Sequence, residues 1–149
     1  MRIIAPETSK RTPGPVSSSP RLHVVAGIIY NRRRDRVLVA RRLPGSHLAG
    51  FWEFPGGKLQ PGEDPLGALT RELREEINIA VKDARSLIRI DHDYTEKSIT
   101  LDVWSVEKWS GACEGREGQE LKWLAIDSLN PEEFPAADQR VIDMLRGRS

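Results

Sequence analysis

The densest group of reactive side chains lies between residues 63 and 76, where glutamates recur around Arg71. Glu72, Glu75 and Glu76 stand at positions i, i+3 and i+4, so a helix would gather them on one face, where like charges repel. Clustered carboxylates are hard oxygen ligands that suit Mg²⁺ or Mn²⁺. A cation held there can bridge phosphates and lower the pKa of a bound water, as cleavage of a phosphoanhydride requires. Taken alone, the same pattern is more typical of a solvated amphipathic helix.

The element that positions these glutamates can be predicted from its own residues. Asp64 can cap free backbone N–H groups, and Pro65 suits the first helical position because no N–H is needed there. Apolar residues then recur every three to four positions and give the helix one face for a core: Leu66, Leu69, Leu73 and Ile77. The pattern predicts a helix over residues 65–77, in which Arg71 can pair with Glu75 one turn later.

A tight turn precedes this helix. Residues 54–57 read Phe-Pro-Gly-Gly, and Gly56 and Gly57 allow the backbone to approach a ligand closely. Lys58 follows the glycines directly. A glycine turn at a set distance before the glutamates favours phosphate chemistry over a merely solvated helix.

Residues 57–79, GKLQPGEDPLGALTRELREEINI, resemble the Nudix box, in which a glycine, a glutamate, an Arg-Glu pair and a Glu-Glu pair stand at fixed spacings. Every position is filled except the final glycine, which is Asn78 here. Asn commonly replaces glycine in the left-handed residue that ends a helix, so the departure concerns the helix end and not the metal site. Further stretches are similar to the MutT-type Nudix hydrolases, which hydrolyse 8-oxo-dGTP: residues 25–29, 41–42, 51–57, 99–109, 115–119 and 134–141.

This resemblance implies a fold, a cofactor and roles for single residues. The fold would be an α/β/α sandwich with a central mixed β-sheet, and water would attack the β phosphorus to release a nucleoside monophosphate and pyrophosphate. The cofactor would be Mg²⁺, with Mn²⁺ as a substitute, and its ligands would be the Gly56 carbonyl, Glu72, Glu75, Glu76 and Glu117. The catalytic set would add Arg71, Lys58 to neutralise phosphate charge, and Glu63 to support the site or assist the attacking water.

Substrate recognition would fall to Arg42, Phe54 and Asp138. Arg42 is either a plain surface cation or the residue that meets the base or phosphate, and Phe54 would stack on the base or line its pocket. MutT-type enzymes carry Asn where this chain has Asp138, whereas the CTP pyrophosphohydrolase branch of the family resembles it with Asp. An ionised Asp only accepts hydrogen bonds, which suits the exocyclic amine of cytosine or the N1–H and N2 amine of guanine. A buried, protonated Asp can also donate and so restore purine recognition. Alternatively, Asp138 caps the terminal helix.

The composition is consistent with one soluble enzyme domain. The chain has 149 residues, 38% of them hydrophobic, and a formal net charge of +1. No long basic and aromatic face or apolar span is apparent, so we expect a small nucleoside triphosphate as partner, and neither polynucleotide nor membrane. The single cysteine, Cys113, suits a reducing compartment and hence the cytoplasm. We expect a monomer.

Residues 1–20 are rich in proline and serine and predict a disordered leader before a Nudix domain at 21–149. Short apolar runs predict strands at 22–30, 37–41, 87–90, 99–106 and 121–126, with helices at 65–77 and 138–146. Alternation of strands with two helices favours an α/β fold. Three functional alternatives stand beside 8-oxo-dGTP hydrolysis: a CTP or dCTP pyrophosphohydrolase, a hydrolase of nucleotide sugars or dinucleoside polyphosphates, and a nucleotide-binding module without activity.

Overall fold

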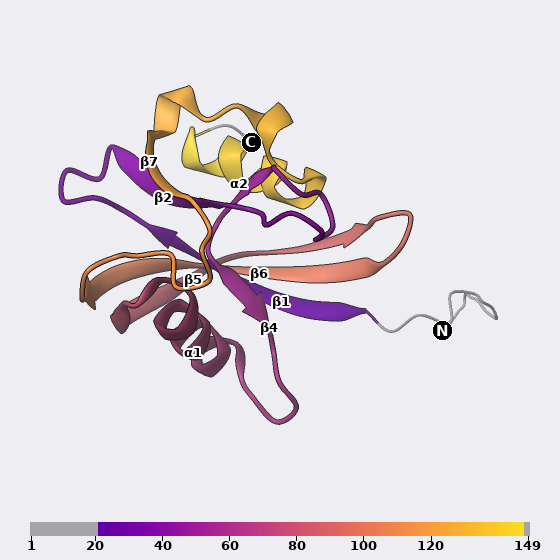
Figure 1. The fold of residues 1–149 in the computed structure, drawn as a ribbon, viewed down its shortest axis with the longest axis horizontal. Coiled ribbons are helices and arrows are strands. Elements are labelled where there is room, and N and C mark those ends of the chain that lie inside the picture. The colour runs from indigo at the N-terminus through magenta and orange to yellow at the C-terminus, as the bar shows by residue number, and fades with distance from the viewer. Residues whose placement is uncertain (1–20, 148–149) are drawn as a thin grey trace.

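The computed structural model describes residues 21–147, so the leader predicted at 1–20 lies outside the described part of the chain. Two sheets form the centre of the molecule (Figure 1), one with the strand order β4-β1-β6-β5 and the other with the order β3-β2-β7. The strands are β1 (Leu22–Ile29), β2 (Arg36–Arg41), β3 (Trp52–Glu53), β4 (Gly56–Lys58), β5 (Ala80–Asp93), β6 (Ser98–Ser110) and β7 (Leu121–Ala125). The α-helices are α1 (Pro65–Ile77) and α2 (Ala136–Leu145), and two short 3₁₀ helices, η1 (Ile126–Ser128) and η2 (Pro131–Glu133), follow β7.

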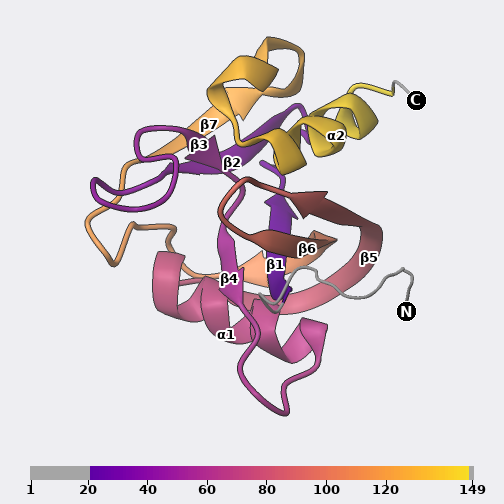
Figure 2. The ribbon, with the colours of Figure 1, turned by 90° about the vertical axis from the view of Figure 1, so that its right-hand side faces the viewer.

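The four-stranded sheet is mixed, because β1 runs parallel to β6 while β4 and β5 pair antiparallel with their neighbours. The helix α1 lies on one side of the central strands and α2 on the other (Figure 2). This confirms the α/β sandwich with a central mixed sheet. Among the described residues, no helix has the length and apolar character needed to cross a bilayer.

Strand β1 contributes to a hydrophobic core on each side of the sheet, because successive side chains of a strand point to opposite faces. Ala26 and Ile28 belong to the core beside α2, whereas Val25 and Ile29 belong to the core beside α1. All four side chains are at most 4% exposed. The two faces of one strand thus support two structurally separate halves of the site described below.

The predicted helix at 65–77 is confirmed at both ends. The Asp64 carboxylate accepts a hydrogen bond from the Gly67 N–H at 2.7 Å, and Pro65 occupies the first turn. Asn78 ends the helix in the left-handed conformation, at φ 62° and ψ 36°, as expected of the residue that replaces glycine. Leu66 is the exception within the apolar stripe, since it remains 40% exposed.

Other predicted boundaries were wrong. Strand β5 extends over Ala80–Asp93 and not only over 87–90. Irregularities in its pairing with β6 interrupt the alternation of apolar and polar residues that reveals a strand. The prediction also missed β3 and β4, which are too short to show a period. Helix α2 begins at Ala136, with Pro135 at the N-cap, so the interpretation of Asp138 as the capping residue was wrong.

Candidate active site

The glycine turn brings β4 against both β1 and α1. A Cβ atom at Gly56 would lie 1.9 Å from the Val25 carbonyl oxygen, and one at Gly57 would lie 2.3 Å from the Glu72 Cδ atom. Neither distance is compatible with a side chain. The two glycines therefore allow the strand to run directly beside the Glu72 carboxylate and to offer its own backbone groups there.

Arg71 forms hydrogen bonds with three of the carboxylates on and before helix α1. Its guanidinium donates to both oxygens of Glu63, at 2.6 and 2.9 Å, and to the Lys58 carbonyl at 3.1 Å. It also donates to Glu72 at 3.1 Å and to Glu75 at 3.3 Å. The hydrogen bonds from Arg71, together with one from the Gln60 N–H, lower the pKa of Glu63 to about 2. The predicted pairing of Arg71 with Glu75 is present, but the bidentate contact with Glu63 is the tighter one.

Glu76 is the most buried of the helix glutamates, with only 9% of its surface exposed. One of its carboxylate oxygens accepts a hydrogen bond from the Gly56 N–H at 3.0 Å. Burial and then the charges of Glu53, Glu117 and Glu72 raise the pKa of Glu76, against the hydrogen bond from Gly56, to a net value of about 8. The pKa of Glu72 is also raised, first by burial and then by Glu75 and Glu117, against the opposing effect of Arg71.

These acids fit a divalent cation by their chemistry. All are hard oxygen donors, and their mutual repulsion is what a bound cation would relieve. Within residues 21–147, no three His, Cys, Asp or Glu side chains are already arranged as a metal site. Glu75 is turned towards Arg71, and its side chain is 58% exposed. The side chains would therefore have to converge on the cation when it binds.

The loop that carries Glu117 is tied to the end of α1. The Arg116 N–H donates to the Glu76 carbonyl at 2.9 Å, and the Gln119 amide donates to the same carbonyl at 3.3 Å. Gln119 also accepts from the Glu117 N–H at 2.9 Å. The loop backbone is thus anchored to the end of α1, which places Glu117 near Glu76 although its side chain remains exposed. A cleft beside Glu117 is lined by Glu53, Glu76 and Arg42.

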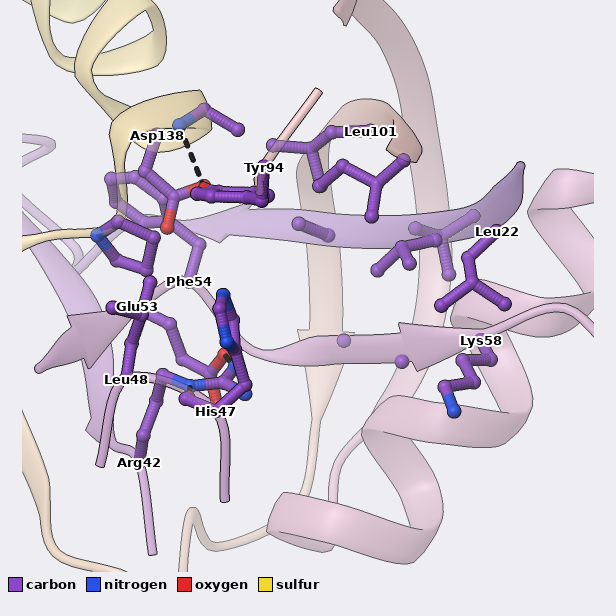
Figure 3. A pocket seen from close by; sticks show the side chains of 18 of the residues that line it. Leu22, Arg42, His47, Leu48, Glu53, Phe54, Lys58, Tyr94, Leu101 and Asp138 are labelled. Carbon is purple, nitrogen blue, oxygen red and sulfur yellow. Dashed lines mark hydrogen bonds and ion pairs between the residues drawn. The ribbon is translucent and has the colours of Figure 1, made fainter. Parts of the chain in front are cut away.

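A cavity of about 220 Å³ opens beside the glycine turn and runs towards α2 (Figure 3). Lys58 lies at one end of this pocket and Asp138 at the other. Phe54 forms part of the wall, but its ring is 3% exposed and stacks on Phe134 at 5.4 Å between centroids. Phe54 therefore lines the pocket as expected, with one ring face already covered by protein.

Arg42 points into this pocket and is not a plain surface cation. It donates to the Glu53 carboxylate and to the His47 carbonyl. Burial raises the pKa of Glu53, and Arg42 opposes that rise. The ion pair is therefore partly buried, and it lies between the pocket and the acidic cluster around Glu76.

Asp138 is 6% exposed and lines the inner end of the pocket. Burial and then the charge of Glu53 raise the pKa of its carboxyl group, and Arg42 lowers it, with a net value of about 8. The carboxyl group therefore keeps its proton to a much higher pH than an ordinary aspartate, and in that neutral form it can both donate and accept a hydrogen bond.

Sequence reasoning missed four residues that line the pocket: His47, Glu53, Tyr94 and Lys97. Glu53 had the clearest signal, because it follows Trp52 in the stretch FWEFPGG and points to the opposite side of the strand. His47 and Tyr94 lie in loops whose packing no local pattern reveals. Among the described residues, the His47 Nε2 atom is buried without a hydrogen-bond partner.

Comparisons with known proteins agree with this geometry. The NUDIX domain model matches residues 25–144. The 8-oxo-dGTP diphosphatase of Escherichia coli K12 is 36% identical over 126 residues, which cover 85% of this chain and 97% of that protein. The CTP pyrophosphohydrolase of the same organism is 37% identical over 119 residues, covering 76% and 87%.

A solved MutT structure, from work on Aliivibrio salmonicida and Vibrio cholerae, superposes with a TM-score of 0.76 at 36% identity, covering 86% of this chain and 98% of the other. Nudix hydrolases generally depend on a divalent metal ion, which agrees with the carboxylates gathered around Glu76. The model match, the relatives, the fold and the glutamate helix lead to one conclusion: this chain belongs to the Nudix hydrolase family.

Proposed function

We propose that this enzyme hydrolyses 8-oxo-dGTP to 8-oxo-dGMP and pyrophosphate, and so removes an oxidised nucleotide from the precursor pool of DNA replication. The observation that carries the proposal is the buried Asp138 at the inner end of the pocket, with its pKa raised to about 8. A neutral carboxyl group presents a donor and an acceptor together, as an amide does, which matches the mixed edge of a guanine base. The 8-oxo-dGTP diphosphatases of Escherichia coli and Haemophilus influenzae, at 36% and 40% identity, support the same substrate.

The metal would be Mg²⁺, or Mn²⁺ as a substitute, held by the Gly56 carbonyl, Glu72, Glu76 and Glu117, with Glu75 turning inward to join them. When bound, this ion supplies charge neutralisation and an activated water for attack on the phosphoanhydride. Arg71 keeps Glu72 in place from the protein side, and Glu63 keeps Arg71 in place. With its pKa near 2 and both oxygens bound to Arg71, Glu63 is better suited to positioning than to accepting a proton.

Two cations would serve the substrate directly. Lys58 borders the pocket beside Gly56 and Gly57, where it would neutralise charge on the phosphates. Arg42 stands between the pocket and the acidic cluster, so it would meet the phosphate nearest the sugar. We propose that the enzyme acts as a cytoplasmic monomer on free nucleoside triphosphates and needs no polynucleotide.

Hydrolysis of CTP is the second candidate, because the Escherichia coli CTP pyrophosphohydrolase is 37% identical to this chain. That substrate fits an ionised Asp138, since the exocyclic amine of cytosine requires an acceptor. An ionised carboxylate can also accept from the N1–H and N2 amine of guanine, so the choice between the two candidates requires a direct comparison of the substrates.

A steady-state comparison of kcat/KM for 8-oxo-dGTP, dGTP, CTP, dCTP and 5-methyl-dCTP with Mg²⁺ tests the proposal, with products identified as monophosphate and pyrophosphate. We expect a preference of at least about a hundredfold for 8-oxo-dGTP over dGTP. Glu76→Gln should abolish turnover, whereas Glu120→Gln, an exposed substitution outside the acidic cluster, should not. A preference for cytidine nucleotides would move the enzyme to the second candidate. The absence of metal-dependent turnover on every nucleotide of the panel would favour another substrate class or a binding module.

A further inference from the structure

The first turn of α2 has no side-chain cap of its own. Pro135 occupies the N-cap position and offers no side-chain acceptor. The N–H groups of a first helical turn nevertheless need partners. The Asp138 N–H donates to the Pro135 carbonyl at 2.9 Å, and the Ala137 N–H donates to the Tyr94 hydroxyl at 3.0 Å. The start of the helix that carries Asp138 is thus held by a side chain from another element, 43 residues away in sequence.

Tyr94 is itself firmly held at the tip of the β5–β6 hairpin. Its N–H donates to the Lys97 carbonyl at 2.8 Å, and the Lys97 N–H donates back at 3.3 Å. The Tyr94 ring meets the ring of His92 at 4.4 Å between centroids and that of His47 at 5.2 Å, both edge to face. Because backbone and ring are both restrained, the hydroxyl is a fixed acceptor for the helix.

Tyr94 and Asp138 border the same pocket, and Figure 3 shows the hydrogen bond that the helix donates to the Tyr94 hydroxyl beside the Asp138 side chain. From this geometry we infer that the Tyr94 hydroxyl is a positioning group for base recognition, which acts through Asp138 and not on the reacting phosphates. The inference rests on the proposed function, because it concerns how the same pocket selects its base. The Ala137 amide is the link, since it precedes Asp138 directly and is the group that the hydroxyl holds.

Loss of the hydroxyl would leave the Ala137 N–H without its partner and loosen the turn that aims Asp138. The base would then be held less selectively. The phosphates would be unaffected, because Lys58 and the glutamates of α1 belong to elements that do not contact this hydroxyl. The expected signature is therefore a change in affinity and base discrimination at an almost constant kcat.

The experiment is a double-mutant cycle of Tyr94→Phe and Asp138→Ala, read as the dissociation constants of 8-oxo-dGMP, dGMP and CMP by titration calorimetry. Tyr94→Phe should weaken the preferred monophosphate about fivefold, in line with the loss of one hydrogen bond, and should change its affinity less than about twofold when Asp138 is already Ala. Hydrogen exchange should become faster at the Ala137 amide. The other tyrosine, Tyr30, lies under Arg34 at 4.1 Å and outside the pocket, so Tyr30→Phe is the matched control and should change nothing.

An equal loss of affinity in both backgrounds would overturn the inference, because the hydroxyl would then act without Asp138. Unchanged discrimination in Tyr94→Phe would overturn it too. These results differ from a failure of the proposed function, in which the wild-type protein itself would not favour 8-oxo-dGMP over dGMP. Calorimetry with product nucleotides keeps the two apart, because it requires no turnover.

Discussion

Replacement of Asp138 by Asn should stabilise the protein, and the gain should depend on pH. The carboxyl group has a pKa of about 8 in the folded protein and 3.8 as its reference value. Between these values the folded state holds a proton that the unfolded state has lost, so a rising pH favours unfolding by at most about 1.4 kcal/mol per unit. Asp138 therefore costs up to about 4 kcal/mol at pH 7, and this cost is absent below pH 4 and levels off above pH 8.

Asn cannot ionise and escapes this cost, although its buried amide needs hydrogen-bond partners of its own. We expect Asp138→Asn to raise Tm by up to about 10 °C at pH 7 and by almost nothing at pH 4. The measurement is thermal denaturation of both proteins from pH 4 to 8.5. Glu53 and Arg42 face the carboxyl group in both proteins, so their intrinsic titration cancels in the difference, and the coupling of Glu53 to the Asp138 charge remains as part of the pH dependence of Asp138. Asp143→Asn, at an exposed position on the same helix, is the control.

The same ionisation should appear in substrate choice. With a pKa of about 8, Asp138 loses its proton as the pH rises from about 7 to about 9, so the ratio of kcat/KM for 8-oxo-dGTP to that for CTP should fall several-fold over this range. In Asp138→Asn the ratio should stay flat. A stability difference that does not vary with pH, or parallel activity profiles for the two proteins, would refute a neutral Asp138 in the folded enzyme.

Three further perturbations address the catalytic side of the sheet. Arg71→Lys removes the bidentate contact with Glu63, so kcat should fall at least about tenfold. An unchanged kcat would show that the paired hydrogen bonds of the guanidinium group are not needed. Gly57→Ala places a Cβ atom 2.3 Å from the Glu72 Cδ atom, so thermal melting followed by circular dichroism should give a lower Tm, and kcat/KM should fall strongly. Wild-type values of both would contradict the contact between this backbone and the Glu72 carboxylate. Millimolar Mg²⁺ should raise the Tm of the wild type but not that of Glu76→Gln, and an equal rise in both would place the metal elsewhere.

The sequence allowed the glutamate helix α1 to be predicted from its first to its last residue, because the Asp64 cap, the apolar period and the terminal Asn78 all act locally. The place of Glu53 in the site could not be predicted from an alternation of apolar and polar residues, because its strand has only two residues. The burial of Asp138 was equally hidden. It depends on the β5–β6 hairpin, which places Tyr94 against a helix that begins 42 residues later in the chain.

The alternation of side chains along β1 gives the enzyme two surfaces with different neighbours. Residues that face α1 belong to the core beneath the glutamates, whereas Ala26 faces the core beside α2 and borders the pocket, which Val25 also reaches at the glycine turn. On the proposed function, we expect substitutions on the face of Ala26 to change the choice of nucleotide without repacking α1, which carries Glu72, Glu75 and Glu76. This arrangement suggests how substrate specificity could be engineered: residues on the pocket face of β1 would be replaced, and the residues of α1 would be kept.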